Sequence, residues 1–170
     1  MLSSSQDRPH EKIAMQIEID DISRPQVLTL LQEHLRNMHE ITPAGQVFAF
    51  NASELRKPNM TFWTAWNGDV LLGCAALQEL SSTHGELKSM RTPANLRRQG
   101  VGRALLEHIL QISRQRGYRE LLLETGSHAD FTPALALYRS IGFERCGPFA
   151  GYQDNGFSIF MSLRLKGDDD

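Results

Sequence analysis

Hydrophobic and polar residues recur with two different periods along the chain, and their order predicts a succession of strands and helices. Residues 14–20, AMQIEID, alternate between apolar and polar positions as a half-buried strand does. A helix is predicted to begin near Ser23 and Pro25, because apolar residues then recur at helical spacing. The residues on its apolar face are Val27, Leu31, Leu35 and Met38.

The next part of the chain predicts a β-hairpin. Residues 39–59 are less regular and include a short predicted helix around residues 53–56. Two apolar segments, TFWTAWN at 61–67 and VLLGCAALQEL at 70–80, flank a turn formed by Asn67, Gly68 and Asp69. A glycine-containing turn between two apolar runs is typical of a hairpin.

A strand–helix–strand unit follows the hairpin. Residues 85–92, GELKSMRT, predict a strand, and the helix after it extends to about Arg116, where Gly117 closes it. Its buried stripe is predicted to hold Val101, Leu105, Ile109 and Ile112. Residues 120–124, ELLLE, are typical of a strand covered on both faces and paired in parallel through a helix. The remaining predicted elements are a helix at 133–140 and strands at 143–146 and 157–165.

Composition fits one soluble α/β domain, predicted over residues 13–165, in a chain of 170 residues that is 41% hydrophobic. The polar segments 1–12 and 166–170 are predicted to be flexible tails. A net charge of −2 gives no general attraction to nucleic acid or to an anionic membrane. Cys74 and Cys146 lack a metal-binding spacing and are expected to be reduced thiols. No apolar signal or membrane-spanning segment is evident, so we expect a cytoplasmic protein, either a monomer or a homodimer.

The segment RRQGVGRALLEH, residues 97–108, places two glycines where a strand passes into a helix. Free N–H groups and the positive end of the helix dipole suit a phosphate or pyrophosphate, and glycines let such a ligand approach the backbone. A P-loop would need GxxxxGK[ST], which is absent, and a dinucleotide fingerprint would need glycine or alanine where Leu105 stands. These two common nucleotide sites are therefore disfavoured.

Two motifs resemble those of the GNAT N-acetyltransferases. Arg97, Gly100 and Gly102 match the acetyl-coenzyme A motif [QR]xxGx[GA], and ALALYRSIGF at 134–143 resembles the later AxxLYxxxGF segment of the family. The resemblance covers residues 14–165. It implies the GNAT fold, a mixed sheet of about six to seven strands flanked by helices around a βαβ core that binds acetyl-CoA. HGELKSMRT and LLLETGS further resemble the small bacterial YsnE-like branch of the family.

The resemblance also implies where the acetyl donor binds. The backbone of Met90, Arg91 and Thr92 would pair with the pantetheine arm as another strand does, with an N–H near Met90 facing the thioester oxygen. The residues expected to hold the pyrophosphate are Arg97, Arg98, Gln99, Gly100, Val101, Gly102 and Arg103. At Phe131 the sequence departs from the family, because many members have there an asparagine that contacts the pantetheine arm.

The implied reaction is direct transfer of an acetyl group from the thioester to a primary amine of a small molecule or peptide. An alkylammonium with a pKa of about 10 must lose a proton before it attacks, and the departing thiolate needs one. Glu86 is the predicted base, and Glu79 and Glu124 compete with it. Lys88 leaves open a structural salt bridge with Glu86 instead. Tyr138, of the LY pair, is the predicted acid, unless it only packs its helix onto the sheet.

The acceptor pocket is expected near the first helix and the loop after it, as in GNAT folds. His39 and Glu40 are therefore candidates for substrate binding, although residues at a helix end are often only solvated. Together with Glu33 and His34 they lack the HExxH spacing of a metal site, so no metal cofactor is expected.

Other groups are expected to be structural. Ser127, His128 and Asp130 are neighbours in one loop, so they predict turn formation and capping rather than a hydrolase triad. The aromatic residues of segment 62–66 are expected to lie at least partly in the core rather than to stack on nucleic-acid bases. Two alternatives to the enzyme are a non-catalytic acyl-CoA sensor with the same fold and a protein that binds a different phosphate ligand at the glycine turn.

Overall fold

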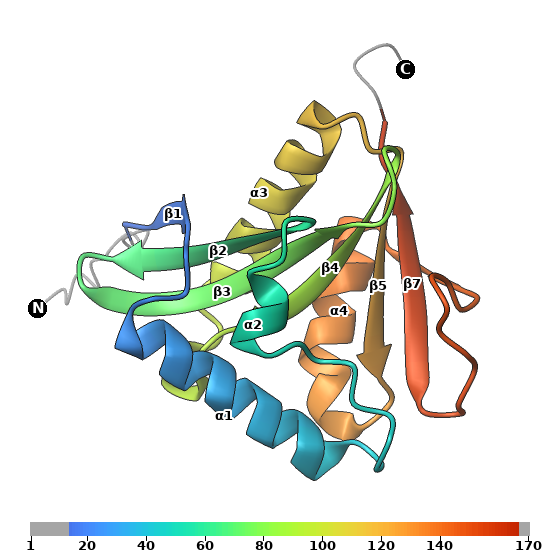
Figure 1. Cartoon of the computed structure of the whole chain (residues 1–170), viewed down its shortest axis with the longest axis horizontal. Helices are drawn as coiled ribbons and strands as arrows, with labels where there is room; N and C mark the ends of the chain where they lie inside the picture. The colour runs from blue at the N-terminus through green and yellow to red at the C-terminus, as the bar shows by residue number, and fades with distance from the viewer. Residues whose placement is uncertain (1–13, 167–170) are drawn as a thin grey trace, which may run out of the picture.

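Seven strands form one mixed sheet in the order β1-β2-β3-β4-β5-β7-β6 in a computed structural model that describes residues 14–166 (Figure 1). The strands are β1 (Gln16–Ile19), β2 (Met60–Asn67), β3 (Val70–Glu79), β4 (His84–Arg91), β5 (Glu120–Gly126), β6 (Glu144–Cys146) and β7 (Ser158–Arg164). The helices are α1 (Pro25–Ile41), α2 (Ala52–Leu55), α3 (Val101–Gln115) and α4 (Thr132–Ile141). The predicted tails 1–12 and 166–170 lie, except for Lys166, outside the described residues.

The elements expected from the hydrophobic pattern are all present, with ends that differ by a few residues. β2 and β3 form the predicted antiparallel hairpin, which closes at the pair Asn67 and Val70. β4 and β5 form the predicted parallel pair joined through α3. The seven-stranded mixed sheet thus confirms the fold class that the resemblance implied.

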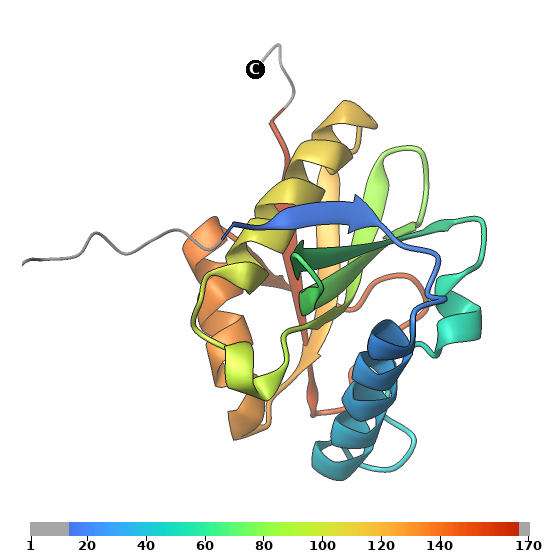
Figure 2. The same cartoon turned by 90° about the vertical axis from the view of Figure 1, so that its left-hand side faces the viewer.

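Helices cover both faces of the sheet, α1 and α2 on one face and α3 and α4 on the other (Figure 2). Because successive side chains of a strand point to opposite faces, each strand contributes to two cores. Phe62 and Trp66 lie in the core with α1, whereas Trp63 lies in the core with α3. All three aromatic rings are at most 5% exposed, so they serve packing and are not available to stack on bases.

The buried face of α1 is shifted from the predicted stripe. Its buried residues are Val27, Leu30, Leu31 and His34. Leu35 and Met38 are only partly buried. The C-terminal half of α1 therefore packs only partly into the hydrophobic core, and it lines a cavity instead.

The parallel pairing of β4 and β5 ends early. It extends from His84 opposite Glu120 to Leu87 opposite Leu123, after which β4 stays with β3 and β5 stays with β7. Ser89, with a positive φ of 52°, lies where the β3–β4 register shifts. The two central strands consequently diverge, and the sheet is open between their C-terminal ends.

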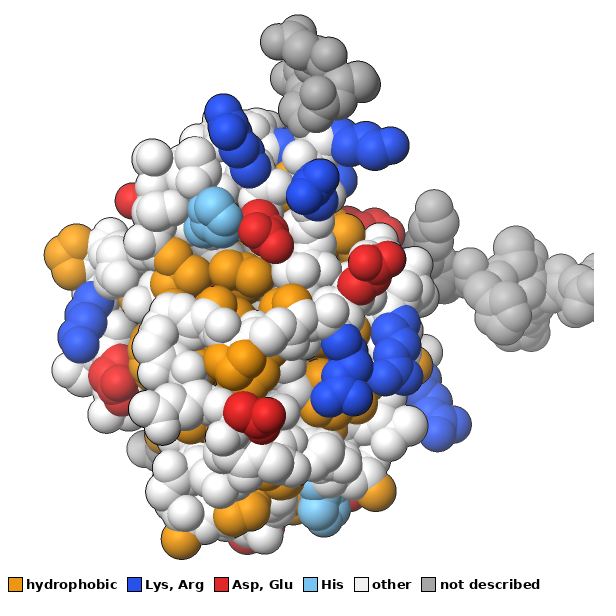
Figure 3. Space-filling view, turned by 90° about the vertical axis from the view of Figure 1, so that its right-hand side faces the viewer, with side chains coloured by type: hydrophobic (Ala, Val, Ile, Leu, Met, Phe, Trp, Pro, Cys, Tyr) orange, Lys and Arg blue, Asp and Glu red, His pale blue; other side chains and the backbone are white. Residues whose placement is uncertain are grey.

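Charged side chains of both signs are interspersed with hydrophobic ones on the face at the β7 side of the molecule (Figure 3). The described residues visible there form no continuous basic surface, in keeping with the net charge of −2. Within residues 14–166, no helix has both the length and the apolar character needed to cross a membrane.

Candidate active site

The divergence of β4 and β5 opens into a cavity of about 860 Å³. One end of the cavity is formed by the first turn of α3 and the other by α1 with the loop 42–49. This volume lies in the range of small-molecule and cofactor sites. The cavity joins the predicted pyrophosphate turn, the open edge of β4 and Tyr138 in one continuous space.

The glycine turn leaves the first turn of α3 without a side-chain cap. Gly100 precedes the helix in the left-handed conformation, with φ of 80°, which glycine adopts without steric cost. Its carbonyl accepts the N–H of Ala104 at 3.0 Å, so the N–H groups of residues 101–103 precede the first helical hydrogen bond. A Cβ on Gly102 would lie 3.3 Å from Leu137 Cδ2, so close packing on α4 also favours glycine there. This turn is suited to an anion.

Three arginines surround this turn and line the cavity, namely Arg97, Arg98 and Arg103. Arg97 and Arg98 are exposed, and Arg103 donates a hydrogen bond to Ser140 Oγ at 2.7 Å. Gln99 is exposed and does not line the cavity. The positive side chains add to the helix dipole, so the end of the cavity at α3 attracts phosphate groups.

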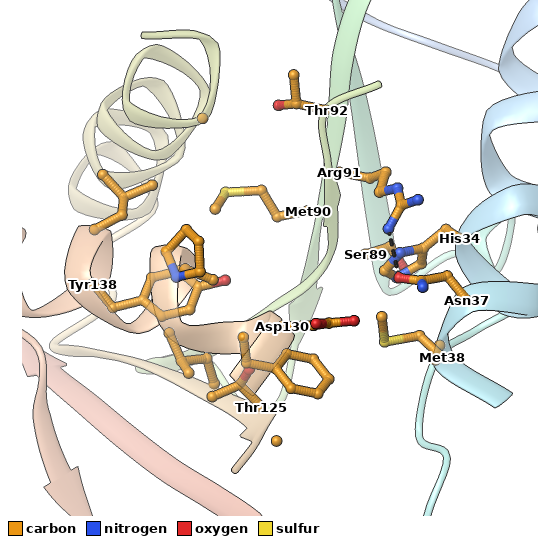
Figure 4. A pocket seen from close by; sticks show the side chains of 18 of the residues that line it. His34, Asn37, Met38, Ser89, Met90, Arg91, Thr92, Thr125, Asp130 and Tyr138 are labelled. Atoms are coloured by element: carbon orange, nitrogen blue, oxygen red, sulfur yellow. Dashed lines mark hydrogen bonds between the residues drawn. The ribbon is translucent and has the colours of Figure 1, made fainter. Parts of the chain in front are cut away.

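Met90, Arg91 and Thr92 line the open edge of β4, as predicted for the pantetheine arm. Because β5 no longer pairs with this part of β4, backbone groups on that edge are free for an extended ligand. The side chains of Met90 and Arg91 point to opposite sides of the strand, Met90 toward α3 and Arg91 toward α1 (Figure 4). The backbone of Arg91 and its guanidinium therefore face different parts of the site.

Tyr138 lies on α4 with its ring edge against Phe143, at 5.8 Å between ring centroids, and it lines the cavity. It is 7% exposed. Burial, and to a smaller extent the charge of Glu124, raises the pKa of its phenol well above the usual value. The hydroxyl therefore keeps its proton at neutral pH and remains available as a hydrogen-bond donor.

Glu86, the predicted base, is held in a buried network on the α1 side of the sheet. Its Oε2 accepts hydrogen bonds from Lys88 Nζ at 3.2 Å and from the Tyr152 hydroxyl at 2.8 Å. Lys88 Nζ also donates to Tyr152 at 3.0 Å and lies 4.0 Å from the ring centroid of Phe50. The structural salt bridge that the sequence left open is therefore present.

Glu124 lies one residue beyond the last β4–β5 pair and also lines the cavity. Burial raises its pKa from 4.5 to about 7; the Ser158 hydroxyl and then Lys88 oppose the shift, and Glu86 adds to it. A carboxyl poised near neutrality is suited to accept a proton. Glu79, the third carboxylate considered, is exposed, accepts a hydrogen bond from Tyr118 and does not line the cavity.

Tyr152 was not anticipated from the sequence. It lies in the loop between β6 and β7. Its ring packs against those of Phe48, Phe149 and Phe160, at 5.0, 5.2 and 5.6 Å between ring centroids. The signal that marks it is weak, a lone aromatic residue within the turn-like segment GYQDNG. Its hydroxyl nevertheless holds both Glu86 and Lys88.

Phe131 also lines the cavity, and its ring packs edge-on against Phe157 at 6.2 Å. A Cβ on Gly126 would lie only 2.4 Å from the Phe131 ring, so glycine is required at the end of β5. Phe131 thus provides an apolar contact at the position where many GNAT N-acetyltransferases have the amide of an asparagine.

His39 and Glu40 do not line the cavity, and both are exposed near the C-terminal end of α1. The α1 residues that line it are His34, Asn37, Met38 and Ile41. Within the described part of the chain, no group of three or more His, Cys, Asp or Glu side chains is placed to hold a metal ion. His128 Nδ1 accepts the N–H of Asp130 at 3.1 Å, which confirms the predicted capping.

Known proteins are similar to this chain in sequence and in architecture. The acetyltransferase (GNAT) family model matches residues 25–143. The uncharacterized N-acetyltransferase YsnE of Bacillus subtilis is 48% identical over 151 residues, which cover 89% of this chain and 100% of YsnE. A crystal structure described as an acyl-CoA N-acyltransferase of Klebsiella pneumoniae has a TM-score of 0.73 at 25% identity, over 91% of this chain and 99% of that one. A family member from Elizabethkingia anophelis with acetyl-CoA bound shares the fold, with a TM-score of 0.61 at 19% identity over 89% of this chain and 98% of that one.

Proposed function

The chain belongs to the GNAT acetyltransferase family, and from this we propose that it transfers the acetyl group of acetyl-CoA directly to a primary amine of a small molecule or peptide. One observation carries the proposal. The uncapped first turn of α3, the unpaired edge of β4 and the protonated Tyr138 open into the same cavity.

In this proposal the donor lies along the α3 side of the cavity. Its pyrophosphate accepts hydrogen bonds from the first turn of α3 and attracts Arg97, Arg98 and Arg103. Its pantetheine arm pairs with the edge of β4 at residues 90–92, and Phe131 covers the arm with an apolar ring. The structure from Elizabethkingia anophelis, which holds acetyl-CoA in the same fold, supports this assignment.

We assign the proton acceptor to Glu124 rather than to Glu86, the first candidate from the sequence. Oε2 of Glu86 already accepts hydrogen bonds from Lys88 and Tyr152, so this oxygen is occupied within the folded chain. Glu124 lies at the opening between the strands with a pKa of about 7, raised by burial. Its pKa therefore lies closer than that of an ordinary carboxyl to the value of about 10 for the acceptor ammonium, so it takes a proton from this ammonium at a lower cost.

The chemical step then needs no covalent enzyme intermediate. The amine nitrogen forms a bond to the carbonyl carbon, and charge that develops on the thioester oxygen is stabilised by an N–H near Met90. As the carbon–sulfur bond breaks, Tyr138, which lines the same cavity, donates its proton to the thiolate. The second proton lost by the nitrogen balances the one that Tyr138 supplied, and solvent carries it back.

The principal alternative is an acyl-CoA sensor without catalysis. A sensor has no need of an ionisable acid and base in the donor cavity, whereas Tyr138 and Glu124 both line it. The two free thiols, Cys74 and Cys146, support the cytoplasmic location expected from the sequence.

The test has two arms. Calorimetric titration with coenzyme A, ADP and NAD identifies the ligand of the turn, and we expect binding of coenzyme A alone. Assays of coenzyme A release across amines, amino acids and peptides then identify the reaction. Binding of the other nucleotides without coenzyme A would contradict the proposal, and binding without release for any acceptor would favour the sensor.

A further inference from the structure

The wall of the cavity opposite the donor turn contains several buried polar atoms without hydrogen-bond partners. Four buried side-chain atoms have no hydrogen-bond partner within the described residues, and all four belong to residues that line this cavity. They are His34 Nδ1, Gln46 Oε1, Ser89 Oγ and Arg91 Nε. Since buried polar atoms are nearly always paired in folded proteins, their concentration on one wall indicates a ligand that pairs them.

Arg91 gives this wall its charge. Its guanidinium lies on the α1 side of β4, where Nη1 donates to Asn37 Oδ1 at 2.9 Å (Figure 4). No carboxylate of residues 14–166 lies within ion-pair distance of it. Burial, and then the charge of Arg97, lowers its pKa from the usual value, and the charge of Glu33 opposes this shift only in part.

His34 is neutral beside this cation. It is 8% exposed, and burial, followed by the charge of Arg91, lowers its pKa to about 4. A neutral imidazole can place an N–H on Nδ1 and donate it without adding a second charge. With the Ser89 hydroxyl, the wall therefore offers one unpaired cation and two neutral donors.

The other side of the cavity is acidic. Glu124 follows the last β4–β5 pair, at the base of the opening. Asp130, on the turn before α4, faces the α1 wall from the opposite side (Figure 4). A ligand with a positive end near Glu124 and a negative end near Arg91 matches this polarity. The lining also includes the apolar side chains of Met38, Val47 and Phe48.

We infer that the acetyl acceptor is a small amino-carboxylate, whose carboxylate binds Arg91, Ser89 and His34 while its amine reaches Glu124. The inference rests on the proposed acetyl transfer and names the acceptor class for that reaction. It also assigns Arg91 a second role, in which the backbone serves the donor and the side chain selects the acceptor. The carboxylate of the acceptor supplies the counter-ion that the folded chain does not.

The experiment compares two matched series of acceptors. One is the ω-amino acids, H₂N–(CH₂)n–COOH, and the other is the alkylamines of equal length that lack the carboxylate. We expect kcat/KM to favour the amino acids by at least about 30-fold, the value of one or two hydrogen bonds to a charged group. The chain length with the highest kcat/KM reports the span between Glu124 and Arg91.

Arg91→Gln tests the anchor through the ratio of kcat/KM for the two series, because a ratio cancels any general loss from the donor site. The substitution should bring the ratio close to one, and Arg91→Lys should restore part of it. Arg103→Gln is the matched control, an arginine of the same cavity on the donor side, and it should weaken coenzyme A binding without changing the ratio.

The outcomes separate the inference from the function on which it rests. Coenzyme A release with no amine at all would contradict the proposed function, and the inference would fall with it. Equal use of both series, a preference for peptide amines without a nearby carboxylate, or an unchanged ratio in Arg91→Gln would overturn the inference and leave acetyl transfer in place.

Discussion

Glu124→Gln removes a carboxyl whose pKa is raised from 4.5 to about 7 by burial. A base must be ionised to accept a proton, so kcat/KM of the wild type should rise with pH through about 7. The variant should lose this dependence, and its kcat/KM should be lower by about 10² to 10⁴-fold, the usual contribution of general acid–base catalysis. A second rise at higher pH, from the acceptor amine itself, should be the same in both proteins and should move with the amine used.

The same substitution makes a prediction for stability, with a definite sign. Between pH 4.5 and about 7 the folded protein holds a proton on Glu124 that the unfolded chain has released. The free energy of unfolding therefore falls as the pH rises through this window. The difference in pKa corresponds to about 3 kcal/mol at pH 8. Glu124→Gln should be more stable than the wild type at pH 8, by up to that amount, and nearly equal to it at pH 4.5.

Glu86→Gln is the matched control, because it removes the neighbouring carboxylate. It should lower the free energy of unfolding, whereas Glu124→Gln should raise it at pH 8. It leaves Lys88, which is 8% exposed, without its ion pair, and should destabilise the fold by about 3–5 kcal/mol. Initial rates of coenzyme A release from pH 5.5 to 9 and denaturant unfolding at pH 5 and 8 supply the measurements. If Glu124→Gln keeps the rise near pH 7 and Glu86→Gln abolishes it, the assignment of the base is wrong and the first candidate from the sequence is correct.

Other substitutions test the remaining parts of the site and the core. Tyr138→Phe should lower kcat by about 10²-fold or more with little change in the dissociation constant for coenzyme A, and an unchanged kcat would remove its role as an acid. Gly102→Asp places a side chain 3.3 Å from Leu137 Cδ2 and a negative charge at the phosphate turn, so calorimetry should show weaker coenzyme A binding, and equal affinity would show the turn to be misassigned. Leu105→Ala should cost about 2–5 kcal/mol in denaturant unfolding, because Leu105 is completely buried between α3 and the sheet; a loss below 1 kcal/mol would contradict that packing. Between pH 6.5 and about 4 the unfolded chain binds a proton on His34 that the folded chain does not, so the wild type loses stability as the pH falls through this window. His34→Asn should remove this part of the loss. Identical profiles of unfolding free energy against pH in the two proteins would refute the burial of His34.

The glycine turn at the α3 end of the cavity was predictable because its determinants are local. The two glycines and three arginines of segment 97–103 lie within one turn, and the backbone of a helix start presents its N–H groups whatever surrounds it. The acceptor side was not predictable in this way. His39 and Glu40 were chosen from their place near the end of the first helix, but the helix presents His34 and Asn37 to the cavity instead.

The assignment of the base likewise depends partly on local sequence and partly on the fold. Strand alternation alone placed Glu86 and Lys88 on one face, and the structure confirms that they meet. It did not indicate that Tyr152, 66 residues away along the chain, would complete the network and occupy Glu86. Nor did it indicate that burial would raise the pKa of Glu124.

The sequence by itself determined the order of strands and helices and the position of the glycine turn at the start of α3. Hydrophobic periodicity and backbone preference act over a few residues, so they can be read without knowledge of the fold. Only the tertiary structure decided which carboxylate titrates near neutrality and which polar atoms lack partners. Desolvation and hydrogen bonding depend on what the rest of the chain brings to a group, and at this cavity the contributors come from α1, β4, β5, α4 and the loop before β7.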